Sequence, residues 1–158
     1  MSAQSLSLTL TSPEDTASRA RDLAAQLLPG DVILLTGDVG AGKTHFARAL
    51  IRALLPQPED IPSPTFTLVQ TYEGRDGAIW HADLYRLTST YEIEELGLAE
   101  AFQDAICVVE WPDRLGPLAP KNALTVTLSP GADDEMRHLS AEWTAPSWDE
   151  KLAIWRQA

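Results

Sequence analysis

The sequence is poor in cysteine, in basic side chains and in long apolar segments. Cys107 is its single cysteine, which excludes a disulfide framework and a metal site built on several thiolates. Because Cys107 lies within an apolar run, we expect a buried structural thiol and not a nucleophile. No apolar segment approaches the roughly 20 residues that span a bilayer, and no basic stretch precedes an apolar one near residue 1. We therefore expect a cytoplasmic protein with no membrane partner.

Positive charge is scarce as well. Lys and Arg number 12 against 23 Asp and Glu in 158 residues, so the formal net charge is −11. Proteins that bind DNA or RNA on their own engage the phosphate backbone with clusters of Lys and Arg. The composition therefore argues against independent DNA binding, and any RNA is expected to be held by a partner. The length and the 44% hydrophobic content suffice for one core, so we expect a single domain over residues 1–158.

A glycine-rich loop that binds phosphate is the most informative feature present. In such a loop, backbone N–H groups surround phosphate oxygens, the lysine reaches the β- and γ-phosphates, and the following hydroxyl binds Mg²⁺. The pattern Gly-x4-Gly-Lys-Thr is completed by Gly37, Asp38, Val39, Gly40, Ala41, Gly42, Lys43 and Thr44. These residues are the predicted nucleotide site, with Lys43 also a candidate catalytic residue and Thr44 a metal ligand.

The segments on either side of this loop are those a P-loop protein requires. An apolar run over 32–35 predicts a buried strand before it, and apolar residues at helical spacing predict a helix after it, ending at Pro56. Earlier in the chain, alternation over 6–10 predicts a half-buried edge strand, and Ser12 is the expected cap of a helix. Strand, loop and helix therefore occur in the required order, and the prolines and acids over 56–64 predict a surface loop.

The rest of the chain completes an α/β pattern. Its expected strands are 66–72, 78–84, 105–109, 123–128 and 138–143. The first two predict an antiparallel hairpin, and the third is expected to lie beside the strand that precedes the loop. Trp148, Leu152 and Trp155 share one face of a terminal helix, which packs on the sheet or, alternatively, docks a partner. We expect an α/β, P-loop NTPase-like, three-layer fold, whose mixed sheet has a parallel core and antiparallel edge strands.

Two carboxylates are candidate catalytic residues and metal ligands. Phosphoryl transfer needs a carboxylate near the metal and a group that orients the nucleophile. Glu110 ends an apolar strand, where it would hold Mg²⁺ directly or through water, unless it is simply an exposed acid. Asp83 ends another strand and would contact the metal shell or orient water; alternatively it caps a turn or pairs with Arg86. His81 is expected to be an ordinary strand histidine with no catalytic role.

Five short motifs follow one another between residues 37 and 118. They are Gly-Asp-x-Gly-Ala-Gly-Lys-Thr at 37–44, Ser-Pro-Thr-Phe-Thr-Leu at 63–68, His-x-Asp-x-Tyr-Arg at 81–86, Glu-Glu-Leu-Gly-Leu at 94–98 and Glu-Trp-Pro at 110–112. Together they resemble the TsaE family, also called YjeE, the bacterial ATPases of tRNA threonylcarbamoyladenosine (t6A) synthesis. The resemblance implies binding of ATP and Mg²⁺ and work with TsaB and TsaD. With TsaC making the threonylcarbamoyl-adenylate, these partners modify adenosine 37 of tRNAs that read codons beginning with A.

The resemblance also implies roles for single residues. Lys43 and Thr44 would bind phosphate and metal, and the two carboxylates would serve the metal and hydrolysis. Thr65 belongs to a switch-like segment, and Trp111 is expected near the nucleotide. His45 stands where the family commonly has a second threonine, so a hydroxyl contact is expected to be lost. Its backbone N–H remains, and binding is expected to survive with altered affinity.

Three other functions remain open at this point. A small-molecule kinase would need an arginine-bearing lid, and no Arg-rich lid segment is visible in the sequence. A regulatory GTPase would carry an Asn-Lys-x-Asp string for guanine, which is absent. A module that binds nucleotide without hydrolysing it is the third alternative.

Overall fold

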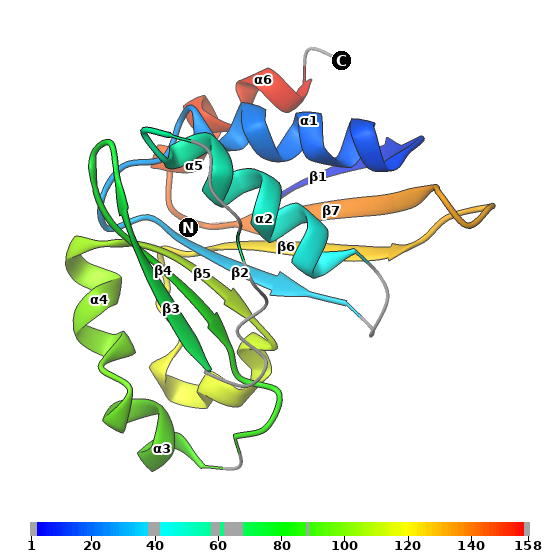
Figure 1. Cartoon of the computed structure of the whole chain (residues 1–158). Coiled ribbons are helices and arrows are strands. Elements are labelled where there is room, and N and C mark those ends of the chain that lie inside the picture. Colours follow the sequence, from blue (N-terminus) through cyan, green and yellow to red (C-terminus); the bar gives the residue numbers. More distant parts are fainter. Residues whose placement is uncertain (1–2, 38–41, 58–60, 62–67, 88, 157–158) are drawn as a thin grey trace.

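The computed structural model describes residues 3–37, 42–57, 61, 68–87 and 89–156 (Figure 1). Its strands are β1 (Gln4–Leu10), β2 (Val32–Thr36), β3 (Val69–Gly74), β4 (Gly77–Asp83), β5 (Ile106–Glu110), β6 (Leu124–Pro130) and β7 (Arg137–Trp143). Its helices are α1 (Pro13–Ala24), α2 (Lys43–Leu54), α3 (Thr90–Glu95), α4 (Leu98–Asp104), α5 (Ser147–Lys151) and α6 (Ala153–Arg156), with the 3₁₀ helix η1 (Pro112–Leu118). In the described ranges, none of these helices has the length and apolar character needed to cross a membrane.

All the strands belong to one sheet in the order β1-β7-β6-β2-β5-β4-β3. The four central strands run parallel, because β2 pairs in parallel with both β5 and β6, and β4 pairs in parallel with β5. At the edges, β3 pairs antiparallel with β4, and β7 pairs antiparallel with both β6 and β1. This confirms the expected mixed sheet and places the 105–109 strand beside the one before the loop.

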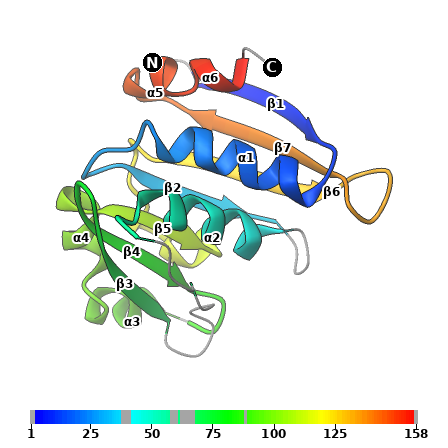
Figure 2. The same ribbon diagram turned by 45° about the horizontal axis from the view of Figure 1, so that its top comes forward.

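Helices cover both faces of the sheet, as Figures 1 and 2 show. Strand β2 is buried on both sides because its side chains alternate between two apolar clusters. Ile33 and Leu35 belong to the cluster that contains α1 and α2, whereas Val32 and Leu34 belong to the cluster with α3, α4 and η1. The three-layer arrangement expected from the sequence is therefore present.

The elements before the loop begin where the sequence predicts. Ser12 caps α1, since its hydroxyl accepts a hydrogen bond from the Asp15 backbone N–H at 3.0 Å, and Pro13 occupies the first helical position. Strand β1 lies at the edge of the sheet. Helix α2 ends at Leu54, two residues before Pro56, which cannot continue it.

Two segments depart in detail from the sequence prediction. The predicted hairpin is present, with a shorter turn at 75–76 and a first strand that begins at Val69. Residues 66 and 67, where the sequence predicted the start of this strand, lie outside the described residues, as does most of the predicted 56–64 loop. The expected terminal helix is divided into α5 and α6 at Leu152. Trp148, Leu152 and Trp155 are fully buried, and the Trp155 indole donates to the Arg19 carbonyl at 3.0 Å. This apolar face therefore belongs to the core of the chain.

Candidate functional site

The predicted site residues lie at the edge where the central parallel strands end. Gly37 follows β2, and Glu110 and Asp83 are the last residues of β5 and β4, opposite each other in register. In open parallel sheets, ligands bind at this carboxyl edge. Helix α2 starts there after Gly42, whose φ of 99° is a backbone conformation that favours glycine. Of the other predicted contacts, residues 38–41 and Thr65 lie outside the described residues.

Thr44 and Glu110 are in direct contact. The Thr44 hydroxyl donates to Glu110 Oε1 at 2.9 Å, joining the first turn of α2 to the end of β5. Glu110 is 1% exposed, so it is not the exposed strand-end acid that the sequence left as an alternative. Two oxygen donors predicted to bind the metal therefore lie side by side at the end of the loop.

His81 is the residue that sequence reasoning missed. Its Nε2 lies 2.7 Å from Glu110 Oε2, and both side chains are buried. An ionised carboxylate accepts hydrogen bonds only, so Nε2 is the donor in that state. Nδ1 of His81 is buried without a hydrogen-bond partner among the residues that the structure describes. The available signal was spacing, because His81 precedes Asp83 by two residues on a strand parallel to β5 and so faces the same side.

Asp83 is buried beside Glu110 and ends its strand with a tight turn. It is 6% exposed, and its Oδ1 accepts a hydrogen bond from the Tyr85 backbone N–H at 3.0 Å. A side chain that accepts from the N–H two residues on stabilises a turn of this kind. The capping role is therefore present, and the register with Glu110 leaves Asp83 at the same edge as the candidate metal ligands.

Lys43 and Trp111 are in contact at the same edge of the sheet. The Lys43 ammonium donates to the Gly37 carbonyl and lies 3.9 Å from the centre of the Trp111 ring. Trp111 has φ 60° and ψ 54°, an uncommon left-handed conformation for a bulky residue, which turns the chain sharply after β5. The Tyr85 ring packs on it at 4.8 Å between centroids. A cation is thus held against an aromatic face where the loop rejoins the helix.

His45 turns away from Lys43 and Trp111. It is exposed, and its Nε2 is 2.9 Å from the carbonyl oxygen of Pro13, at the first turn of α1. The side chain that replaces the expected second threonine therefore links the starts of α1 and α2.

The donor set fits Mg²⁺ better than a transition metal. Mg²⁺ takes one or two carboxylates and hydroxyl oxygens, keeps several waters and completes its shell with substrate phosphates. Thr44, Glu110 and Asp83 supply such oxygens at one edge. In the described ranges, no cluster of three or more His, Cys, Asp or Glu is suited to hold a metal on its own. A site built from these residues would need the nucleotide's phosphates to complete it.

The comparison with known proteins decides the family. Residues 10–139 match the family described as "Threonylcarbamoyl adenosine biosynthesis protein TsaE". The chain belongs to the TsaE family. It is 42% identical over 126 residues to the tRNA threonylcarbamoyladenosine biosynthesis protein TsaE of Rickettsia bellii (strain RML369-C), covering 80% of this chain and 88% of that protein. The protein of the same name from Bacillus subtilis (strain 168) is 37% identical over 124 residues, or 78% and 77% of the two chains.

The fold of this TsaE-family chain is also that of a solved relative. The crystal structure of Bacillus subtilis YdiB superposes with a TM-score of 0.79 at 25% identity, covering 99% of this chain and 97% of that one. The match extends past the 37–118 region that carries the motifs, so the β6–β7 hairpin and the terminal helices are part of the shared architecture.

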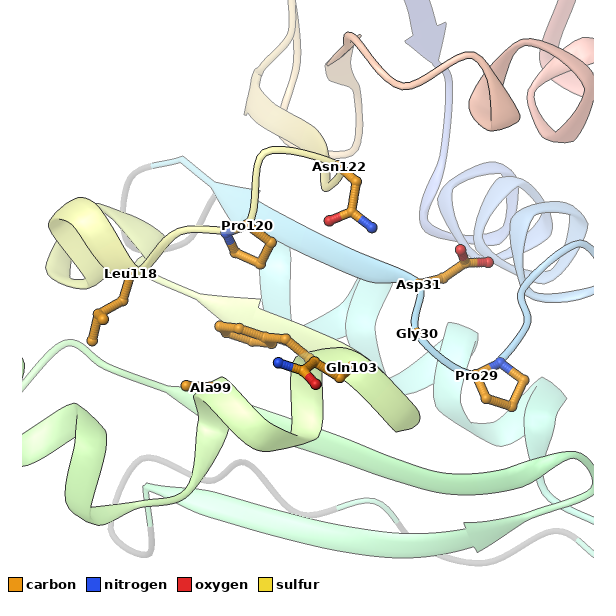
Figure 3. A pocket seen from close by; sticks show the side chains of 9 residues that line it. Pro29, Gly30, Asp31, Ala99, Gln103, Leu118, Pro120 and Asn122 are labelled. Atoms are coloured by element: carbon orange, nitrogen blue, oxygen red, sulfur yellow. The ribbon is translucent and has the colours of Figure 1, made fainter.

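Two further features of this TsaE-family chain lie away from the loop. A cavity of about 590 Å³ opens at the opposite edge of the sheet, between the segment that precedes β2, helix α4 and the segment that precedes β6 (Figure 3). None of the predicted site residues lines it. Cys107 is fully buried in β5, and burial, followed by the charge of Asp104, raises the pKa of its thiol to about 12. The thiol is therefore structural, as the sequence predicted.

Proposed function

We propose that the chain binds ATP with Mg²⁺ at the carboxyl edge of the central strands and hydrolyses the β–γ phosphoanhydride bond. The observation that carries this proposal is the contact between the Thr44 hydroxyl and the buried carboxylate of Glu110 at 2.9 Å. A nucleotide-binding module without hydrolysis has no need of a second buried carboxylate there, yet Asp83 ends the neighbouring strand in register with Glu110. The proposal is an ATPase whose turnover is weak until partners bind.

Each residue at this edge then has a separate task. Lys43 moves from the Gly37 carbonyl to the β- and γ-phosphates, because the phosphates are the stronger acceptors. Thr44 and Glu110 would hold Mg²⁺, and Asp83 would contact its shell or orient the attacking water. When bound, the ion would supply positive charge beside the phosphate oxygens. Trp111 lies beside the nucleotide, and Thr65 reads the γ-phosphate from its switch-like segment.

The pathway follows from the family and from the charge. Curated relatives are named for tRNA threonylcarbamoyladenosine biosynthesis, and we propose that this chain serves the same bacterial pathway in the cytoplasm. It would act with TsaB and TsaD, downstream of TsaC, in the threonylcarbamoylation of adenosine 37 in tRNAs that read ANN codons. A net charge of −11 disfavours direct contact with a phosphate backbone. The tRNA is therefore held by the partners, and ATP hydrolysis acts on their complex.

The first experiment measures phosphate release from ATP and Mg²⁺ by the purified chain, alone and then with TsaB, TsaD and tRNA. Strong stimulation by the partners is the expected result. Transfer of phosphate to a small metabolite would instead establish a kinase, and tight ATP binding with no release in any mixture would establish a module that does not hydrolyse ATP.

Variants separate binding from turnover. Lys43→Ala is expected to weaken ATP binding, because it removes the cation that meets the phosphates. Asp83→Ala and Glu110→Ala are expected to lower turnover far more than ATP affinity. Glu142→Ala, on the exposed face of β7, is the matched loss of a carboxylate elsewhere. Undiminished turnover in both carboxylate variants would contradict their assigned roles.

A further inference from the structure

A groove runs between α1 and α2, the two helices that lie side by side on one face of the sheet (Figures 1 and 2). Its volume is about 470 Å³. Three half-buried alanines line it, Ala17 on α1 and Ala49 and Ala53 on α2, and the other lining residues are all basic. The groove therefore combines a small apolar base with positively charged sides.

This concentration of positive charge is unusual for so acidic a chain. The formal net charge is −11, yet among the described residues no carboxylate lines the groove, and α2 contains no Asp or Glu. On α1, Glu14, Asp15 and Asp22 are outside the lining set, and Asp15 pairs with Arg19 at 3.9 Å. A solvated helix face commonly carries charges of both signs. A row of one sign indicates a surface that meets an anion.

The basic side chains of α2 lie in one row. His45, Arg48 and Arg52 are three or four residues apart, so they share one face of the helix. From the first to the last they span about 10 Å, at 1.5 Å per residue. Arg21 adds a further guanidinium from α1. The Arg48 side chain is held in place, because its Nε donates to the Ile61 carbonyl at 2.8 Å.

We propose that this groove docks a short acidic segment of a protein partner, whose carboxylates pair with Arg21 and Arg48. The inference goes beyond the proposed ATP site and requires no nucleotide. A guanidinium can pair with a carboxylate through two parallel N–H···O bonds, which orients the bound segment. Because the alanine side chains are small, the backbone of the segment can approach both helices closely.

The lining favours a protein segment over an RNA strand. Proteins hold single-stranded RNA with aromatic side chains on which the bases stack, and no Phe, Tyr or Trp of the described ranges lines the groove. A long phosphate backbone would also extend past the basic row onto a surface that is acidic overall. A segment with about two or three carboxylates fits within the length of the row.

The test compares two peptides of equal length that differ in charge. Fluorescence anisotropy at low ionic strength measures binding of labelled hexaglutamate and of labelled hexaglutamine, and the chain is expected to bind only the former. Arg21→Gln should weaken binding of hexaglutamate about 2- to 5-fold, the range of an exposed ion pair. Adding Arg48→Gln should increase this loss. Arg156→Gln, the loss of an exposed arginine on α6, should leave binding unchanged.

Three results would overturn this inference. They are no binding of hexaglutamate by the unmodified chain, equal binding by the unmodified chain and the double variant Arg21→Gln/Arg48→Gln, and tighter binding of an oligouridylate with the same number of negative charges. The last result would mean that the groove holds an RNA backbone. Arg21 is exposed, so Arg21→Gln is expected to keep its fold, and thermal unfolding of each variant checks this.

Nuclear magnetic resonance locates the peptide. With nitroxide-labelled hexaglutamate, the amide signals of residues 17–21 and 45–53 are expected to broaden, and broadening confined to other residues would contradict the inference. Loss of binding in Lys43→Ala but not in Arg21→Gln would place the peptide in the phosphate loop and would also contradict it. The proposed function fails separately, through absence of ATP binding or hydrolysis, because these peptide measurements contain no nucleotide.

Discussion

Replacing His81 tests the contact that orients Glu110. His81→Leu fills the buried position with an apolar side chain of similar volume. It leaves Glu110 Oε2 without the hydrogen bond to His81 Nε2, which lies 2.7 Å away. A hydrogen bond to a charged group contributes about 1.5–3 kcal/mol, and an unpaired buried acceptor costs a similar amount. We therefore expect the free energy of unfolding to fall by about 2–3 kcal/mol. For a chain of 158 residues, this lowers the Tm by roughly 4–12 °C.

The double variant separates this bond from general packing. When both partners are replaced by apolar groups, no buried acceptor remains unpaired, and the loss becomes small. His81→Leu should therefore cost less than about 1 kcal/mol when it is introduced into Glu110→Leu. His138→Leu, an exposed histidine on β7, is the control, with an expected change within about 0.5 kcal/mol. Urea unfolding followed by circular dichroism measures all four variants.

A positioning role also predicts a change that a purely structural role would not produce. If His81 orients Glu110 toward the metal, His81→Leu should raise the Mg²⁺ concentration for half-maximal ATP hydrolysis about 10-fold or more, as loss of such supporting contacts does at metal sites. An unchanged Mg²⁺ dependence would contradict a positioning role for His81, and stability losses of His81→Leu and Glu110→Leu that simply add would contradict a stabilising bond between the two side chains.

Three other predictions follow from single residues. Cys107 should resist iodoacetamide at pH 8 until urea unfolds the chain. Because burial raises its pKa to about 12, the free energy of unfolding should be unaffected by this thiol below about pH 8.5 and should fall by up to about 1.4 kcal/mol per pH unit above it. Cys107→Ala should remove this pH dependence. Trp155→Ala should lower the free energy of unfolding by about 3–5 kcal/mol, since the indole is fully buried, and a loss below 1 kcal/mol in urea titrations would contradict its place in the core. ATP with Mg²⁺ should change the fluorescence of Trp111, because Lys43 leaves the Trp111 ring to meet the phosphates. The change should persist in Trp80→Phe and vanish in Trp111→Phe. A change that survives in Trp111→Phe would mean that Trp111 is not the residue that reports binding.

Sequence reasoning was most successful where the signal is local. The cap at Ser12, the end of α2 before Pro56 and the alternation in β1 each depend on residues within one or two turns of the chain, and all three are confirmed. The terminal helix was predicted as one element because Trp148, Leu152 and Trp155 share a helical spacing. The structure divides it at Leu152; a segment this short has little tendency of its own to form one continuous helix.

The candidate site was predictable in part. The loop motif and the ends of two apolar strands identified Lys43, Thr44, Asp83 and Glu110, and the structure brings these residues to one edge of the sheet. His81 was assigned no role, although its spacing of two residues from Asp83 puts both side chains on the same face of the strand. Its contact with Glu110 depends on the parallel pairing of β4 with β5, which the spacing of residues in either strand does not specify.

The sequence by itself determined the phosphate-loop motif on which the proposed chemistry rests. The residues of a phosphate loop act together with neighbouring backbone groups, so the motif can be recognised without knowledge of the fold. Only the tertiary structure decided which distant residues meet that loop. The sheet order placed Glu110 with His81 on one side of β2 and Arg137 on the other. That order follows from the burial of both faces of the whole sheet, a property of the entire chain and not of any one segment.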